Sequence, residues 1–188
     1  MTEFIEKYKD IWGEDPRKLL AQYDYQRELT AKLDVLKPEE LNTQTFYEIY
    51  LWKLNRFPRI KDGLLAELKD VAKIHPKEHR NADDVLKKLL SSPGIALPMA
   101  STILRFLNPS VFQIIDDRVY RIVRPQKTKY PPKPPKLNDR YLSRSTGIYF
   151  DYLDDLHNLS SNLLPFESAD RILYILDIEC GNKIGDKS

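Results

Sequence analysis

The chain has 188 residues, 41% of them hydrophobic, which is enough for one core and too few for two large domains. Its 30 Lys and Arg against 28 Asp and Glu leave a net charge of +2, which excludes a globally basic, histone-like protein. We expect a cytoplasmic protein, nucleoid-associated in a bacterial source, because no apolar run is long enough for a membrane span or a signal peptide. The single cysteine, Cys180, excludes a disulfide framework and a four-cysteine iron–sulfur cluster.

The N-terminal half has apolar residues at helical spacing and lacks the alternation typical of strands, so we predict an all-α fold. The first apolar stripe covers residues 4–12. Asp15-Pro16 has the form of a helix start, and we expect that helix to continue to about Val35. The next helix, rich in aromatic residues, is expected in the core and ends at Pro58. The whole chain, 1–188, is predicted to form one helical domain, in one lobe or two.

The C-terminal half continues the helical pattern, with a helix expected to end near Ile74. Residues 81–124 hold the most informative segment, a hairpin and an aspartate loop. Residues 124–136 (RPQKTKYPPKPPK) contain five prolines and five basic residues, which predicts an exposed, extended connector. Two C-terminal helices are expected within residues 141–181, the second burying four apolar side chains: Ile172, Leu173, Ile175 and Leu176.

The hairpin lies in residues 89–123, LLSSPGIALPMASTILRFLNPSVFQIIDDRVYRIV. A helix is expected to end at Ser91 or Ser92, and a tight turn follows at Pro93-Gly94-Ile95-Ala96. A second helix then begins with Pro98 in its first turn. Such a hairpin presents backbone N–H groups at a helix N-terminus, which suit a phosphate oxygen. Asp116 is predicted to be the N-cap of the following helix.

These residues resemble the helix-hairpin-helix (HhH-GPD) DNA glycosylase superfamily, whose best-known member is endonuclease III. The family pattern is Leu-Pro-Gly-Val-Gly, then Ala, an apolar helix, and Val-Asp followed by Val or Ile and Arg. The chain matches it without a gap, at Ser92-Pro93-Gly94-Ile95-Ala96, Ala100, Leu104 and Ile115-Asp116-Asp117-Arg118-Val119-Tyr120-Arg121. The strong resemblance covers roughly thirty residues and is moderately specific for a short motif.

The resemblance implies that Asp116 is the catalytic carboxylate of a base-excision repair enzyme acting on damaged double-stranded DNA. A carboxylate can stabilise the sugar cation that forms as an N-glycosidic bond breaks, or deprotonate the attacking water. The target nucleotide has to leave the base stack, so a base pocket is implied too. The expected DNA contacts are Gly94, Ile95, Ala96, Leu97, Arg118, Arg121, Lys127 and Lys129. The pocket candidates, chosen because they cluster in sequence, are Tyr50, Trp52, Lys53 and Arg56.

The chain departs from the family pattern at two hairpin positions. Pro98 stands where bifunctional members have a Schiff-base lysine, and proline cannot form an imine, so a monofunctional hydrolase is expected. Ala96 replaces the second glycine, which leaves less room for a phosphate. No cofactor is expected, since the cluster cysteines are absent; the resemblance allows a monovalent cation at the hairpin.

Basic residues are concentrated after Asp116. Seven Lys and Arg side chains fall between Arg118 and Lys136 with no acidic residue among them, and such a strip would make duplex binding salt-dependent. A solvated linker is the alternative. A competing zinc motif, His75 to His79 (HPKEH), is disfavoured because Pro76 keeps His75 out of a helix, and no metal site is expected. Two other functions stay open: a catalytically silent DNA-binding module and a helical protein-interaction domain.

Overall fold

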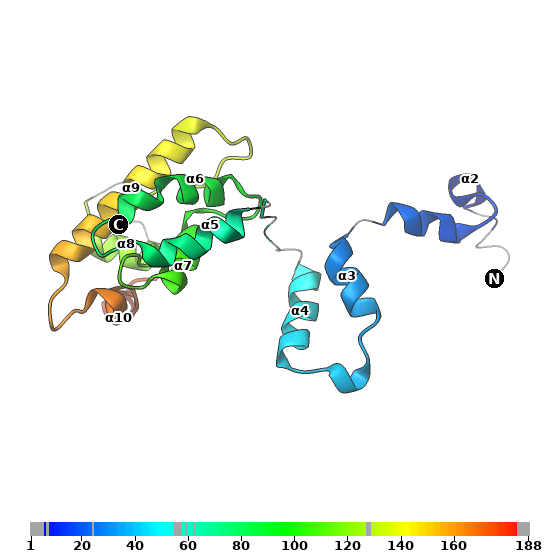
Figure 1. The fold of residues 1–188 in the computed structure, drawn as a ribbon, viewed down its shortest axis with the longest axis horizontal. Coiled ribbons are helices and arrows are strands. Elements are labelled where there is room, and N and C mark those ends of the chain that lie inside the picture. The colour runs from blue at the N-terminus through cyan, green and yellow to red at the C-terminus, as the bar shows by residue number, and fades with distance from the viewer. Residues whose placement is uncertain are drawn as a thin grey trace. The chain divides into compact units, whose positions relative to one another are not determined.

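The computed structural model describes residues 6, 8–23, 25–54, 58, 60–61, 63–126 and 129–183, without the side chains of Trp12 and Lys18. Within these residues the chain forms helices and no strand, so the all-α prediction is confirmed (Figure 1). The sequence did not decide whether the chain forms one helical lobe or two. The structure divides into two compact units, Met1–Phe57 and Pro58–Ser188, which we describe separately.

The described residues of the N-terminal unit form short α-helices and 3-10 helices. Its predicted continuous helix from Asp15 to Val35 is wrong. Asp15 does cap a helix, since its side chain accepts a hydrogen bond from the Arg17 N–H at 3.0 Å, but Tyr23 is extended and ends it. The elements are α2 (Lys9–Trp12), a 3-10 helix (Pro16–Gln22), α3 (Arg27–Asp34), a 3-10 helix (Pro38–Glu40) and α4 (Thr43–Leu54).

Helices α3 and α4 pack as a pair around Trp52. Its indole N–H donates to the Thr30 hydroxyl at 2.8 Å, and the Tyr25 hydroxyl donates to its carbonyl oxygen at 2.8 Å. The prediction that α4 is a core helix is wrong, because none of its side chains is buried and Phe46 and Tyr50 are more than half exposed. One short partner helix covers only one side of α4, so its other aromatic residues stay in contact with solvent.

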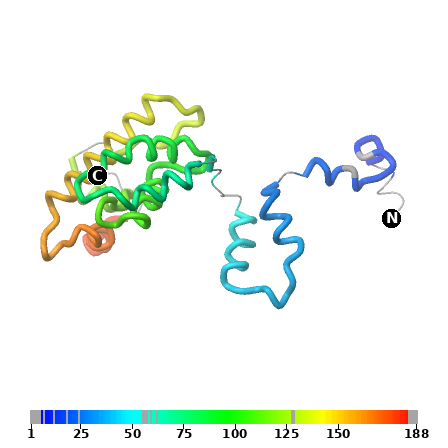
Figure 2. The backbone as a smooth tube through the Cα atoms, viewed as in Figure 1, coloured from blue at the N-terminus to red at the C-terminus, as the bar shows by residue number. Residues whose placement is uncertain are grey.

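The C-terminal unit holds the main core. Its longest helix, α9, runs beside α6 (Figure 2), and α8 packs against α10. The core side chains come mostly from α6, the hairpin, α7 and α9. The elements are α5 (Leu64–Asp70), 3-10 helices at Val71–Lys73 and His79–Ala82, α6 (Asp83–Ser91), α7 (Leu97–Leu107), α8 (Asp117–Val123), α9 (Asp139–Leu159) and α10 (Phe166–Glu179).

The expected inward face of α10 is wrong. Leu173 is buried, but Ile172, Ile175 and Leu176 are each more than 40% exposed. The buried face instead carries Phe166, Ala169, Asp170, Leu173 and Asp177. The helix is rotated toward its two aspartates because each lies beside arginine side chains of other elements, Asp170 beside Arg105 and Asp177 beside Arg118 and Arg121.

The described part of the connector, 124–126 and 129–136, contains no helix, as predicted, but it is not simply exposed. Tyr130 is 7% exposed and joins the core, and Lys133 is half-buried. The prolines keep the segment extended, and these two side chains hold it against the helices. In the described parts of the chain, no helix has both the length and the apolar character needed to cross a membrane.

Candidate nucleic-acid interface

The hairpin has the predicted boundaries. Helix α6 ends at Ser91, Gly94 has a φ of 81°, and α7 begins at Leu97 with Pro98 at its second position. Glycine adopts a positive φ without steric cost, which explains why a glycine stands at position 94 of the turn. The side chain of Ile95 is fully buried and fixes the turn to the core, while Gly94 is exposed.

The Ile95 N–H donates to the Ser92 carbonyl oxygen at 3.2 Å, but other amides of the hairpin have no such partner. Pro93 and Pro98 have no N–H to offer, and the N–H groups of Gly94, Ala96 and Leu97 donate to no acceptor within the described residues. The start of α7 adds the positive end of its dipole. A phosphate oxygen is a suitable acceptor for amides arranged in this way. The helical spacing of the sequence predicts a buried face on α7 made of Met99, Ala100, Ile103, Leu104 and Leu107. Ala100 and Leu104 are buried, whereas Met99 and Leu107 are exposed, the Met99 side chain by 51%.

Three backbone carbonyl groups of the hairpin already accept hydrogen bonds from a lysine side chain. The Lys133 ammonium donates to the carbonyl oxygens of Leu90 at 2.6 Å, Ser92 at 2.7 Å and Ile95 at 2.9 Å. Partial burial lowers the pKa of this ammonium. The monovalent cation that the resemblance allows at the hairpin therefore does not fit these carbonyls as the chain stands, because a side-chain cation already binds all three.

Asp116 is the N-cap of α8, as predicted. Its Oδ1 accepts a hydrogen bond from the Val119 N–H at 2.8 Å, and its backbone is extended. The carboxylate is half-buried, and this burial raises its pKa above the ordinary value, against the opposing effect of the Val119 and Arg118 amides. A raised pKa makes a carboxylate a better proton acceptor when it is ionised.

The segment that leads to Asp116 is irregular in backbone but anchored at consecutive residues. The Tyr149 and Tyr152 hydroxyls of α9 donate to the carbonyl oxygens of Gln113 at 2.9 Å and Ile114 at 2.7 Å. The Ile115 N–H donates to the Ser101 hydroxyl of α7 at 3.1 Å. Because Ser101 lies on the second hairpin helix, Asp116 is held at a fixed position relative to the hairpin.

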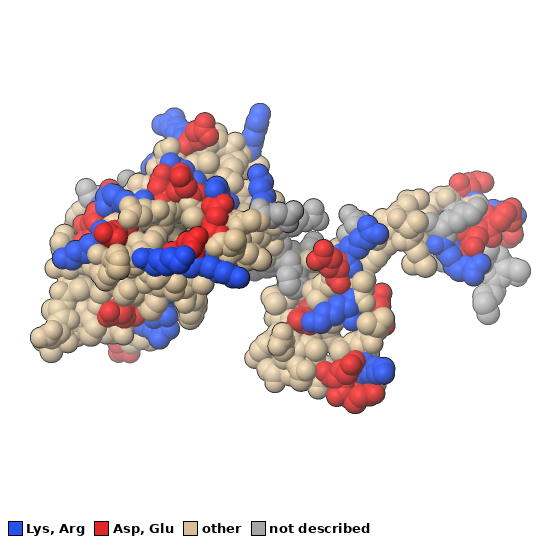
Figure 3. All heavy atoms as spheres, viewed as in Figure 1, with Lys and Arg blue, Asp and Glu red and all other residues tan. Residues whose placement is uncertain are grey.

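Four residues of the predicted basic strip form ion pairs within the described part of the chain. Arg118 and Arg121 both bind the fully buried Asp177, at 2.8 and 2.7 Å, and their side chains are only 13% and 14% exposed. Arg124 forms an ion pair with Asp155 at 2.7 Å. On the face of the C-terminal unit seen in Figure 3, Lys and Arg lie among Asp and Glu rather than in one patch. Arg118 and Arg121 therefore stabilise the fold, and their expected role as exposed phosphate contacts has no free guanidinium to support it.

The remaining strip residues have separate environments. Lys129 forms an ion pair with Asp117 at 2.6 Å and is 61% exposed, so its ammonium can also reach solvent or a ligand. Tyr130 is buried in the core and donates its hydroxyl to the Asp117 carboxylate at 2.7 Å, so its ring is not available to stack on a base. Burial and the Asp117 carboxylate raise the pKa of Tyr130 far above its ordinary value. Lys127 lies outside the described residues.

Of the base-pocket candidates, Tyr50, Trp52 and Lys53 lie in the N-terminal unit, whereas Asp116 lies in the C-terminal unit. Trp52 packs within the α3–α4 pair, and Tyr50 and Lys53 are exposed on α4. Arg56 lies outside the described residues. The closeness of Tyr50, Trp52 and Lys53 in sequence reflects their positions on one helix, α4, and by itself gives no evidence for a pocket.

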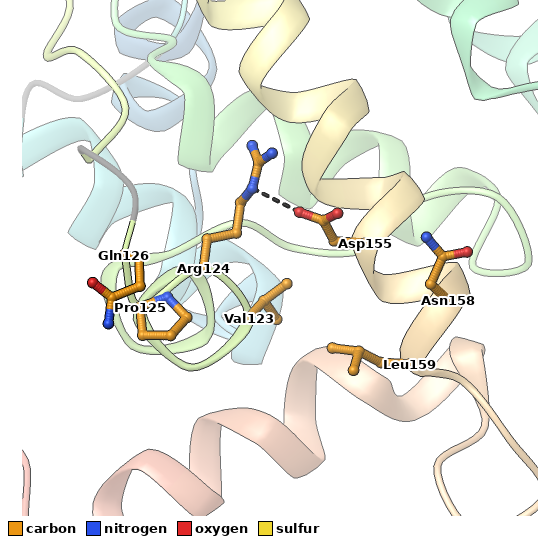
Figure 4. A pocket seen from close by; sticks show the side chains of 7 residues that line it. All are labelled: Val123, Arg124, Pro125, Gln126, Asp155, Asn158 and Leu159. Carbon is orange, nitrogen blue, oxygen red and sulfur yellow. Dashed lines mark ion pairs between the residues drawn. The ribbon is translucent and has the colours of Figure 1, made fainter.

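A hollow of about 330 Å³ lies at the C-terminal end of α8, whereas Asp116 caps the N-terminal end. Figure 4 shows the side chains that line the hollow. The hollow is formed by the C-terminal end of α8, the start of the connector and the last turns of α9. Arg124 points toward Asp155 along one side. Since α8 has seven residues and a helix rises about 1.5 Å per residue, this hollow is roughly 10 Å from the aspartate. The lining residues are Val123, Arg124, Pro125, Gln126, Asp155, Asn158 and Leu159.

The zinc motif at residues 75–79 does not have the helical backbone that the motif requires. Lys77 has a φ of 71°, so residues 75–79 are not one helix, and the imidazole of His79 is buried beside Asp154 and Arg80. No group of three His, Cys, Asp or Glu side chains able to hold a metal occurs in the described parts of either unit.

Comparison with known proteins assigns the chain to no family. No protein-family model matches the sequence, and neither the curated proteins nor the solved structures gave a match.

Proposed function

We propose that the protein binds duplex DNA through the hairpin and acts as a monofunctional DNA glycosylase, with Asp116 as its carboxylate. The observation that carries the proposal is the hydrogen bond from the Ile115 N–H to Ser101, at 3.1 Å. It fixes the aspartate to the same helix whose N-terminal amides are free to bind a phosphate. To act on an extruded nucleotide, a protein needs a site that binds the DNA backbone and a reacting group, both held at fixed positions relative to each other.

The chemistry needs one carboxylate and one water molecule. As the glycosidic bond lengthens, the sugar gains positive charge, and an ionised Asp116 would stabilise it electrostatically. The same carboxylate could take the proton of the attacking water, for which its raised pKa is favourable. Pro98 offers no amine, so the proposed reaction ends with a free base and an intact abasic strand.

A catalytically silent DNA-binding protein is the second candidate, and two observations favour it. Asp116 already has a structural role as the cap of α8, and the hollow at Val123–Leu159 lies at the opposite end of that helix. In this alternative the hairpin still binds phosphate, and the aspartate serves the fold alone.

The test is a panel of duplexes that each carry one oxidised, alkylated, deaminated or mismatched base. For the parent protein we expect release of one class of base, with strand breakage only after alkali and no adduct trapped by borohydride. Asp116→Asn should keep the fold and the DNA affinity, because asparagine also caps helices, while base release falls roughly 10²–10⁴-fold. Salt-sensitive DNA binding without any base release would favour the silent binder, and absence of DNA binding would overturn both candidates.

A further inference from the structure

Three carbonyl oxygens of the hairpin converge on one side-chain nitrogen. Lys133 lies 2.6 Å from Leu90 O, 2.7 Å from Ser92 O and 2.9 Å from Ile95 O. An ammonium has three N–H donors and each is used here, so its coordination by the hairpin is complete. These carbonyls come from the last turn of α6 and from both sides of the Pro93-Gly94 turn.

The carbonyls need a positive partner. Leu90, Ser92 and Ile95 are each at most 1% exposed, and Leu90 O belongs to the C-terminal end of α6, where the helix dipole is negative. The neighbouring carbonyls of that end are satisfied locally, since Ser92 N–H donates to Leu89 O and the Ser92 hydroxyl to Lys88 O. Ser92 O also accepts from the Ile95 N–H at 3.2 Å, so the carbonyls that depend most on Lys133 are Leu90 O and Ile95 O, and leaving these two unpartnered would be costly.

We propose that the hairpin carbonyls form a cation site that the chain fills with its own Lys133 ammonium. Removing the ammonium should leave a site that binds a monovalent cation such as K⁺. The three oxygens are neutral, and no carboxylate is bound to the same nitrogen, so a monovalent cation suits the site better than a hard divalent one. The proposal rests on the geometry of the hairpin and does not depend on the proposed function.

The same lysine joins the two parts of the candidate interface. Lys129 and Tyr130 both bind Asp117, the residue after Asp116, and Lys133 binds the hairpin three residues further along the connector. The segment from Lys129 to Lys133 therefore connects the start of α8 to the turn between α6 and α7. Lys133 is a positioning residue for the hairpin turn.

The experiment compares the thermal unfolding of the full chain in KCl and in choline chloride at equal ionic strength, because choline is too bulky to enter the site. The parent protein should have the same Tm in both salts. Lys133→Met should lower the Tm by roughly 5–10 °C in choline chloride and regain at least half of that loss in KCl. Lys136→Met, at an exposed position of the same connector, should show neither effect.

Two results would overturn the proposal. One is a Lys133→Met protein whose Tm equals that of the parent in choline chloride, and the other is a loss of Tm that KCl does not reverse. If the variant does not fold in either salt, NMR of lysine ammonium groups in the parent protein decides instead. One slowly exchanging ammonium signal that is absent from a Lys133→Arg protein supports the proposal, and absence of such a signal contradicts it. None of these measurements contains DNA, so they are independent of the proposed glycosylase activity.

Discussion

Met99 offers a test of the hairpin in which folding and DNA binding should respond in opposite directions. It is the third residue of α7, its side chain is 51% exposed, and Ala96 is the N-cap of the helix. A glutamate at the third position can reach back to the N-cap amide, as in a capping box. Met99→Glu would therefore occupy the Ala96 N–H and place a negative charge where we propose that a phosphate binds.

The expected magnitudes follow from the helix terminus. A carboxylate in the first turn stabilises a helix by about 0.3–1 kcal/mol, so the Tm should rise by roughly 1–4 °C. Repulsion of one phosphate at short range in a high-dielectric surrounding is about 1 kcal/mol, or roughly fivefold in Kd. The slope of log K against log salt should become shallower by about 0.9, as for one lost phosphate contact.

The assay is fluorescence anisotropy of a labelled duplex at several salt concentrations, with differential scanning calorimetry of the same proteins. Phe106→Glu is the matched control, because it adds the same charge on α7 at a 66% exposed position away from the hairpin turn. If Met99→Glu bound the duplex as tightly as the parent with the same salt slope, the hairpin would not contact the phosphate backbone, and the proposed function would lose its DNA-binding surface.

Two further predictions concern stability. Asp177→Asn removes the charge that binds two arginines at a fully buried position, so the free energy of unfolding, measured by urea denaturation, should fall by roughly 3 kcal/mol. Asp155 is 40% exposed, so Asp155→Asn should lower it by less than about 1 kcal/mol. Equal effects of the two substitutions would refute the assignment of Asp177 as the main anchor. Burial lowers the pKa of His79 and of His157, so the unfolded chain binds protons more readily and the Tm should decline as the pH falls below about 6.5. His79→Gln should weaken this decline and His75→Gln, at an exposed position, should not; a Tm unchanged between pH 7.5 and 5 would contradict the reasoning.

Local sequence signals predicted the hairpin and the cap of α8 well. Pro93-Gly94 marks a turn through the backbone preferences of two residues, and Asp116 precedes its helix by the spacing that an N-cap needs. These features depend on neighbours within a few positions, so one sequence is enough to locate them. The glycosylase activity itself remains a prediction.

Long-range pairing is what the sequence could not predict. Arg118 and Arg121 were assigned to an exposed strip, but their partner, Asp177, lies more than 50 residues further along the chain. The same ion pairs explain why the most apolar face of α10 is exposed, because Asp177 has to face inward to bind the two arginines. Lys133 was also counted as a free charge, and nothing near it in sequence indicated that Leu90, Ser92 and Ile95 would surround its ammonium.

The anchors of residues 113–115 have a consequence for the cooperativity of the fold. Partners from α7 and α9 hold this irregular segment, and Asp170 of α10 adds a hydrogen bond from the Ile114 N–H at 3.3 Å. Releasing the segment breaks contacts to three helices at once, so its opening requires a free energy close to that of unfolding the whole C-terminal unit. The segment thus belongs to the same unfolding unit as the core helices, although its backbone has the form of a loop.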